Sequence, residues 1–475
     1  MSISFLDNKK KGILTLISAV LINLLTGNLF SFPNFIPYYK SFLYYHNGKR
    51  ELVTDQQLYF VAPVGICIHN VLPSVTGLLD KILGTRILTI IGSISLLVSQ
   101  ILMYKFIDYY IIIIAYGLFG ICGSLTYFQS LKNCWKYFPE KKGLISGIIF
   151  SSFGLSSFIF TSLGDYLINP KDSQKVDGYY SEEVSERFLM YVKVFIICII
   201  VMGTLSCILC FPFKEESSKE NNSLENSEIN KDQNTIDNLT PETDENDEND
   251  ELTLKESILS LDFFLCLTVA GCTLIYGFLL SNTYRNFGSL SLSSYETALK
   301  YLSKAFTLLN TFSRLVWGFI FDKTGFKILY IIVCINQLIC GGLIYTSSGN
   351  IVTYFIVVCF GVLSYAGHII LFPNLIHHKF GVDNSVVILG ICGIFAGISA
   401  IIGPILTKNI SNNEDYLKIY LIGVAPTAAS LLIACFIKDE KLQKKNKIIK
   451  LEEEKDVLMK EEDINNNRQS DSNDI

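Results

Sequence analysis

The chain has 475 residues, half of them hydrophobic, and a mean hydropathy of +0.39. This is too apolar for an ordinary soluble protein of that length. Charged residues are concentrated in two segments, so the net charge of −5 describes those segments rather than the apolar remainder, and no basic patch indicates a nucleic acid partner.

Twelve apolar runs are long enough to cross a bilayer, whose hydrocarbon core of about 30 Å takes about 20 residues of helix. Helices are expected because backbone groups in lipid must bond within their own segment, and the runs lack the alternation of barrel strands. The sequence therefore predicts an all-α integral membrane protein with twelve transmembrane helices, the first too long for a cleaved signal peptide. The runs are 12–32, 57–79, 87–105, 109–131, 143–167, 190–212, 258–281, 300–321, 327–347, 351–374, 385–407 and 415–437.

The connections between these runs differ in charge. With both termini in the cytoplasm, the inner connections hold most of the basic residues close to the membrane, as the positive-inside rule requires. We therefore expect a multi-pass protein with cytoplasmic termini, in the plasma membrane by default and in an organelle membrane otherwise. The inner basic residues are Lys9, Lys10, Lys11, Lys81, Arg86, Lys132, Lys136, Lys141, Lys142, Lys323, Lys327 and Lys379.

Two polar segments divide the chain. Residues 214–252 carry 14 Asp or Glu against three Lys, a composition that cannot bury a core and predicts disorder. The expected organisation is an N-terminal six-helix half (1–213), an acidic cytoplasmic linker (214–256), a C-terminal six-helix half (257–437) and a charged cytoplasmic tail (438–475). A spacer role is favoured for both segments over an acidic interaction site.

The sequence predicts no metal site, cofactor or enzyme activity. Nearly all of the 13 cysteines lie inside apolar runs, where small buried side chains are expected rather than disulfides or ligands. His377 and His378 are adjacent but have no third ligand nearby in the sequence. The chain contains no ATP-binding motif of the form G-x4-G-K-[ST], and no nucleophile–base set stands out.

Two loops repeat one pattern. The second and third runs are joined by GLLDKILGTR, and the eighth and ninth are joined by GFIFDKTGFK. Their aspartates, Asp80 and Asp322, lie 242 residues apart, and so do Phe138 and Phe380 in the loops after the fourth and tenth runs. Two coincidences at one offset predict two related halves.

The repeated loops are also candidates for a gate. An aspartate at the cytoplasmic end of a helix can pair with a basic residue of the other half and hold that face closed until the pair breaks. A simple basic anchor needs no aspartate. We therefore expect Asp80, Arg86, Asp322 and Lys327 to form a cytoplasmic gate.

At these loops the chain resembles the major facilitator superfamily, whose transporters have twelve helices in two pseudo-symmetric halves, a long central loop and this loop signature in both halves. The resemblance covers residues 12–437. The pattern R-x3-G-x3-D from Arg314 to Asp322 is similar to that of monocarboxylate transporters and oxalate/formate antiporters, as are GNLFSFPNFIPYYKSFL and KYFPEKKGLISGIIFSSFGLSS. The resemblance implies that Arg314 engages a substrate carboxylate.

Three features differ from that group. Asn34 stands where animal monocarboxylate transporters carry a lysine after Phe-Pro, and Asn310 stands where they carry an aspartate four residues before the arginine. The eleventh run, 385–407, lacks the lysine of the oxalate antiporters. The chain therefore lacks two basic side chains of that group. One is the lysine that accepts a proton, and the other is the second cation that would bind a dicarboxylate.

Arg314 is the charge that an apolar run accommodates least. It lies eight residues before Asp322, about 12 Å along a helix and near the bilayer midplane, where exposure to lipid would cost at least about 2.5–3.5 kcal/mol. Thr307, Asn310, Arg314 and Trp317 recur at helical spacing, so they share a face that we expect to line a polar cavity. A guanidinium fits the two oxygens of a substrate carboxylate, and the alternative is a structural ion pair.

Other polar side chains interrupt the apolar runs. His69 and His368 are candidates for solute contact or a proton relay, and each can instead bond a carbonyl of a neighbouring helix. Tyr127, Gln129 and Asn34 are weaker candidates for solute contact by the same reasoning. Glycines in the fifth and eleventh runs predict close helix packing. They are Gly143, Gly147, Gly154, Gly390, Gly393 and Gly397.

These observations predict a monomeric secondary transporter, a symporter or antiporter that moves a small organic anion such as a monocarboxylate by alternating access. Its expected partners are the solute, the lipid bilayer and, where coupling requires it, a co-transported proton; exchange or the solute's own gradient would serve as well. Two alternatives stay open. One is a transporter of an amino acid, a sugar or a drug-like molecule, and the other is a non-transporting membrane sensor or scaffold.

Overall fold

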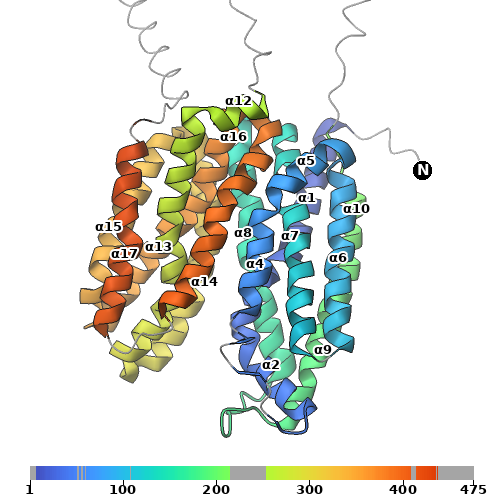
Figure 1. Ribbon diagram of the computed structural model, residues 1–475, viewed down its shortest axis with the longest axis vertical. Helices are drawn as coiled ribbons and strands as arrows, with labels where there is room; N and C mark the ends of the chain where they lie inside the picture. The colour runs from blue at the N-terminus through green and yellow to red at the C-terminus, as the bar shows by residue number, and fades with distance from the viewer. Residues whose placement is uncertain are drawn as a thin grey trace, which may run out of the picture.

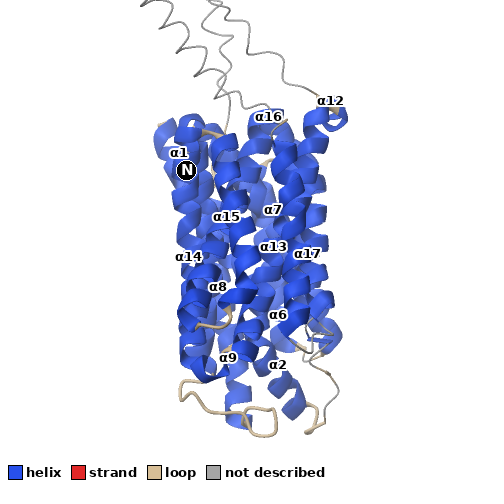
Figure 2. Ribbon diagram, turned by 90° about the vertical axis from the view of Figure 1, so that its left-hand side faces the viewer, coloured by secondary structure: helices blue, strands red, loops and turns tan. Residues whose placement is uncertain are grey.

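The computed structural model describes residues 7–213, 253–407 and 413–436, with gaps at 51, 52, 55, 56, 59, 107 and 435. Over these residues the chain is almost entirely helical, and the long helices run side by side along one axis (Figure 2). Most of the predicted acidic linker (residues 214–252) and the whole predicted tail lie outside the described residues.

The N-terminal half contains six spans, two of which are built from more than one helix. The first span is α1 (Asn8–Thr26), the 3-10 turn η1 (Gly27–Ser31) and α2 (Phe32–His46). The second is α4 (Val61–Val71) and α5 (Pro73–Leu83), bent by 50°. The next three are α6 (Thr85–Lys105), α7 (Tyr109–Tyr137) and α8 (Lys142–Ile168), with the short turn η2 (Pro139–Lys141) before α8. The sixth is α9 (Glu182–Cys198), the π-helical turn η3 (Ile199–Gly203) and α10 (Thr204–Leu209).

The C-terminal half begins with a short helix, and its longest helix holds two spans. The elements are α12 (Leu254–Leu259), α13 (Leu261–Ser291), the turn η5 (Ser293–Tyr295), α14 (Glu296–Thr324), α15 (Phe326–Ser347), α16 (Ile351–Thr407) and α17 (Asn413–Ala434). At 57 residues, α16 would be about 85 Å long at 1.5 Å per residue, far more than one crossing. Gly381, with a φ of 74°, breaks it into two.

The described helices account for the twelve predicted spans. Nine segments are long and apolar enough to cross a membrane, and the bent α4–α5 pair is a tenth. The break in α16 adds an eleventh. The twelfth is α14, whose polar face lowers its apolarity.

The boundaries of several elements differ from the predicted runs. The first span extends to Asn8–His46, beyond the predicted 12–32, because the segment 33–46, rich in aromatic residues, continues as the helix α2. The described chain resumes inside the predicted linker, where Thr253 and Glu256 form a capping box that starts α12. The Thr253 hydrogen bonds hold the pKa of the Glu256 carboxyl below its usual range.

Each half has its own apolar core, and a further cluster lies between the halves around Trp135, Phe150 and Ile370. In Figure 1 the ribbons of the two halves meet at the top, near α12 and the end of α5, and diverge toward the bottom. We call the top the latch end and the bottom the far end. Large apolar side chains such as Ile94, Ile197 and Phe312 are exposed on the outer helices, as expected of a surface that faces lipid.

Candidate functional site

One close contact between the halves joins α8 and α14. A Cβ on Gly143 would lie 2.4 Å from the carbonyl oxygen of Gly318, and a Cβ on Gly147 would lie 2.9 Å from that of Arg314. The glycines of α8 therefore let the two backbones touch, which confirms the close packing predicted for the fifth run. A side chain at Gly147 would displace the backbone of Arg314.

Arg314 is 5% exposed and bonds across the boundary between the halves. Its Nη1 donates to the carbonyl oxygen of Phe150 at 2.7 Å, and its Nη2 donates to Oδ1 of Asn310 at 3.2 Å. Its Nε is buried and has no hydrogen-bond partner among the described residues. No carboxylate of the described chain lies within ion-pair distance of this guanidinium. The predicted alternative, a structural ion pair, finds no support there.

Two tyrosines complete the surroundings of the guanidinium. Tyr127 of α7 and Tyr365 of α16 lie close enough to interact electrostatically with it. Both are buried, and Tyr127 stacks on Phe150 with ring centroids 4.9 Å apart. We call Arg314, Asn310, Tyr127 and Tyr365 the Arg314 group. It draws on α7 from one half and on α14 and α16 from the other, so solute bound there would contact both halves.

His69 lies next to this group. Its ring makes an edge contact with Tyr127 at 5.2 Å and stacks on Phe153 at 5.6 Å. A Cβ on Gly123 would lie 2.2 Å from His69 Nδ1, so the absence of a side chain at Gly123 makes room for the imidazole. His69 Nδ1 is buried and unpartnered among the described residues.

Other predicted site residues lie apart from the Arg314 group. Asn34 is exposed on α2 and donates to the hydroxyl of Thr161. Gln129 is fully buried and donates to Thr76 within its own half. Trp317 donates from Nε1 to the carbonyl of Leu363 at 2.9 Å, so its indole nitrogen holds α14 to α16.

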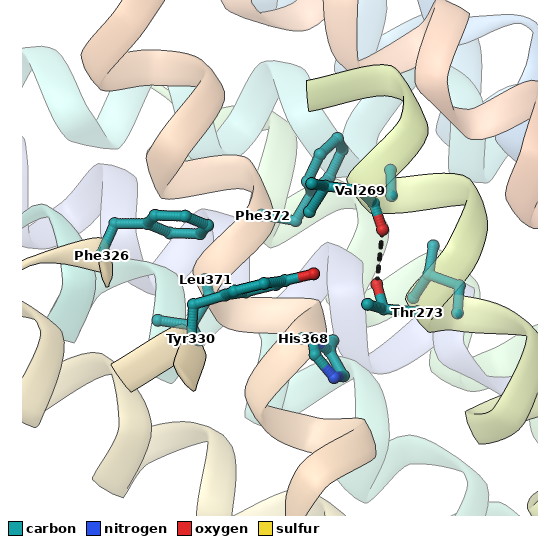
Figure 3. Close-up of a pocket in the computed structure, with 9 residues that line it drawn as sticks. Val269, Thr273, Phe326, Tyr330, His368, Leu371 and Phe372 are labelled. Atoms are coloured by element: carbon teal, nitrogen blue, oxygen red, sulfur yellow. Dashed lines mark hydrogen bonds between the residues drawn. The ribbon is translucent and has the colours of Figure 1, made fainter. Parts of the chain in front are cut away.

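His368 faces a small pocket inside the C-terminal half. His368 lines this pocket together with Tyr330 and Thr273 (Figure 3). The imidazole lies 5.6 Å from the Tyr330 ring, while Thr273 bonds the carbonyl of Val269. The structure therefore does not bring His368 into the Arg314 group.

At the latch end, Asp322 bonds directly to the other half. Its two carboxylate oxygens accept hydrogen bonds from the backbone nitrogens of Gly143 and Leu144 at 2.7 and 2.8 Å. These nitrogens belong to the first turn of α8, where a carboxylate is stabilised by unpaired N–H groups and the helix dipole. Asp322 thus caps α8.

Asp80 reaches the other half through a lysine. It is 8% exposed, accepts a bond from Thr85 and pairs with Lys132 at 3.1 Å. Lys132 also pairs with Asp383 of α16 at 3.1 Å, and Lys136 pairs with the same carboxylate at 3.0 Å. The chain Asp80–Lys132–Asp383 therefore links the halves.

The two predicted basic members of the gate play different parts. Arg86 is on the same half as Asp80 and donates from Nε to the carbonyl of Cys207, so this contact does not cross between halves. Lys327 lies at the start of α15. Lys81, one of the predicted inner basic residues, has its Nζ 3.5 Å from Oδ1 of Asn384 across the boundary.

Sequence reasoning did not single out Lys132 or Asp383 as gate residues. Lys132 is 6% exposed, and a lysine is seldom buried without a partner. Lys132 directly follows the predicted run 109–131, and this position at the end of an apolar run was the available signal. Asp383 lies in a predicted loop, and its pairing with two lysines about 250 residues earlier in the chain depends on the packing of the halves.

Substituting Asp383 by asparagine is expected to loosen the latch end. Lys132 and Lys136 would lose a shared carboxylate; since this carboxylate is partly exposed, the effect is on the order of 1 kcal/mol, about fivefold in the equilibrium between closed and open latch ends. Amide exchange in residues 139–147 and 382–390 should become faster. Asp415→Asn, which alters an exposed pair with Lys418, is the control and should leave these segments unchanged.

Comparison with known proteins places the chain in a family. A profile described as Major Facilitator Superfamily matches residues 16–404. The chain belongs to the major facilitator superfamily. It is 23% identical over 402 residues to YhjX, an uncharacterized MFS-type transporter of Escherichia coli strain K12. The aligned region covers 82% of this chain and 85% of YhjX.

Solved structures share the superfamily fold. A variant of the E. coli fucose:proton symporter FucP superposes with a TM-score of 0.61 at 12% identity, covering 89% of this chain and 97% of that one. The proton:xylose symporter XylE bound to 6-bromo-6-deoxy-D-glucose gives 0.57 at 12% identity, covering 91% and 97%. FucP in its outward conformation gives 0.59 at 12% identity, covering 89% and 97%.

These findings confirm the predicted fold class, an all-α membrane protein of twelve helices in two halves. The family and fold are those of secondary transporters, so this major facilitator protein is a multi-pass membrane protein that moves a small solute. The superfamily match does not extend to the predicted monocarboxylate subgroup.

Proposed function

We propose that this transporter carries a small, monocarboxylate-like organic anion and that Arg314 receives its carboxylate. The observation that supports this is the charge of the buried guanidinium, whose two hydrogen bonds go to uncharged oxygens of Phe150 and Asn310. A buried charge is costly unless it is paired. A carboxylate bound in the Arg314 group would supply the missing negative charge and would bond two N–H groups at once.

The arrangement of the latch suggests how the anion would cross. The Arg314 group lies between the halves, and the contacts of Asp322, Lys132 and Asp383 hold one end together. Transport by alternating access would require these contacts to break while others form at the far end. We assign the latch end to the cytoplasm because basic residues such as Lys9, Lys81 and Lys141 gather there.

A second candidate is a neutral solute such as a sugar. It is favoured by the uncharged members of the Arg314 group, because Asn310, Tyr127 and Tyr365 all offer groups that bond hydroxyls. The solved structures of similar fold are also named as sugar symporters. In this case Arg314 would bond a hydroxyl oxygen, and its charge would stay uncompensated.

Uptake by purified protein in liposomes separates the two candidates. We expect a labelled short-chain monocarboxylate to enter faster than into empty liposomes, and other monocarboxylates to compete with it. The matching neutral amide should compete about 10- to 150-fold more weakly, because a hydrogen bond to a charged group contributes about 1.5–3 kcal/mol. Uptake of a hexose or xylose without uptake of any carboxylate would refute the anion proposal.

A further inference from the structure

Buried ionisable groups are few in the part of the chain that the structure describes. Besides tyrosines and cysteines, six side chains that can carry a charge are less than 9% exposed. They are Asp80, Lys132, Arg314, His69, His368 and His377. If one of these six side chains binds a transported proton, its change of charge must leave the contacts at the latch end intact.

Most of these six side chains either have an ionic partner or lie away from the Arg314 group. Asp80 and Lys132 pair with each other at the latch end. His377 is also there, stacked on Trp135 with ring centroids 4.6 Å apart. His368 faces the pocket inside the C-terminal half. His69 is the imidazole that contacts the Arg314 group.

His69 and Arg314 lie at similar depths in opposite halves. The offset of 242 residues that relates Asp80 to Asp322 relates His69 to position 311, three residues from Arg314 and therefore about one helical turn away. Tyr127 contacts both residues, through the edge of the His69 ring and through its electrostatic interaction with the guanidinium.

The groups that face His69 carry no formal charge at neutral pH. The charge of the imidazole therefore depends on the solute site. From α7 it meets Gly123 and the phenol of Tyr127, from η1 it meets Phe30, and from α8 it meets Phe153. Tyr127 is the titratable member of this set. On another face, α16 approaches α4 through glycines, beside Asn70 and Cys67. The charged group that Tyr127 connects to His69 is the guanidinium of Arg314.

We propose that His69 binds the proton that is transported together with the anion, an inference that rests on the proposed function. With the site empty, a proton on His69 would place a second cation near Arg314 in a desolvated interior, which is unfavourable. A bound carboxylate offsets the charge of Arg314 and permits the imidazole to take up a proton. Binding of either one thus favours binding of the other.

The transported charges then balance. One proton from water adds to an unprotonated nitrogen of neutral His69 on one side, and a monocarboxylate binds at Arg314. On the other side the carboxylate leaves, and the imidazolium returns the proton to water. The cargo of one proton and one monoanion carries no net charge, so the membrane potential would not oppose it.

The test compares pH-driven accumulation with exchange in liposomes. For the wild type, a pH one unit lower outside should drive accumulation of the monocarboxylate toward about tenfold, the ratio that one proton per solute supports. His69→Gln, which cannot take up a proton, should lose this accumulation. Its exchange of internal for external solute should stay measurable and should lose its pH dependence. The matched control His368→Gln removes another buried imidazole and should accumulate solute like the wild type.

The outcomes distinguish this inference from the function on which it rests. If the wild type moves no carboxylate at all, the proposed function fails. If the wild type transports the carboxylate but a pH difference drives no accumulation, or if His69→Gln accumulates it fully, the role of His69 is refuted. Should His69→Gln not fold, a pH-sensitive dye inside wild-type liposomes still decides the coupling: no acidification on adding solute outside would contradict it.

Discussion

Replacing Arg314 with alanine is expected to lower uptake of the anion by about 10- to 150-fold at solute concentrations below the KM, since the lost charged hydrogen bonds contribute about 1.5–3 kcal/mol. Arg314→Lys should fall between alanine and the wild type, because lysine keeps the charge but loses the planar fork that bonds two oxygens. Initial rates in liposomes measure both effects. Arg285→Ala on α13, which removes an arginine bonded to Ser303, is the control and should stay within about twofold.

Asn310→Asp gives a second, independent reading of the same site. The amide of Asn310 already accepts a bond from the guanidinium, so a carboxylate in its place would pair with Arg314 and compete with the anion. Uptake should fall over the whole pH range in which the monocarboxylate is ionised, because pairing with Arg314 favours the ionised form of the introduced carboxyl group. If Arg314 only holds α14 to α8, the new ion pair should leave uptake unchanged, and that result would contradict the substrate role.

The polar face of α14 could be predicted because helical spacing is a local property. Thr307, Asn310 and Arg314 recur on one face, and the opposite face shows Phe312 and Phe319 at 54% and 49% exposed. The main partner of Arg314 could not be predicted in the same way. It is the carbonyl of Phe150, and every residue has a carbonyl, so the choice depends on how closely α8 and α14 approach.

The latch shows the same division between pattern and packing. The repeat identified Asp80 and Asp322 as a pair of related residues, and both do contribute to links between the halves. Their partners differ because the two halves place different groups opposite them. Asp322 meets the backbone of the first turn of α8, whereas Asp80 meets Lys132, and a one-dimensional pattern of side chains contains neither contact.

His368 illustrates the limit for isolated polar residues. Its place inside an apolar run suggested solute contact or a proton relay. Tyr365, three residues earlier, lies near Arg314, yet His368 contacts Tyr330 of α15. A helix in the middle of a bundle is surrounded by neighbours, so residues one turn apart can face different ones, and hydropathy does not distinguish these faces.

Gly318→Leu is expected to prevent the latch end from closing. A Cβ on Gly318 would lie 2.2 Å from the carbonyl oxygen of Gly143 and 3.3 Å from the Cα of Gly147, and backbone atoms cannot turn aside as a side chain can. The helices α8 and α14 would have to separate, and Asp322 would then lose its bonds to the first turn of α8, a cap of about 1 kcal/mol. Uptake should fall at least about tenfold, the effect of a bias of about 1.4 kcal/mol against the closed state.

The two separate cores predict that this variant still folds, because each half keeps its own buried apolar cluster. Monodisperse protein with faster amide exchange in residues 142–150 would therefore show a loss of closure rather than a loss of fold. Gly342→Leu is the matched control: nothing lies within 4 Å of a Cβ there, so uptake and exchange should match the wild type. Gly318→Ala introduces the same Cβ without the rest of the side chain, and should already impair uptake if backbone contact is what closes this end. Wild-type uptake by both Gly318 variants would mean that transport proceeds without the close approach of α8 and α14.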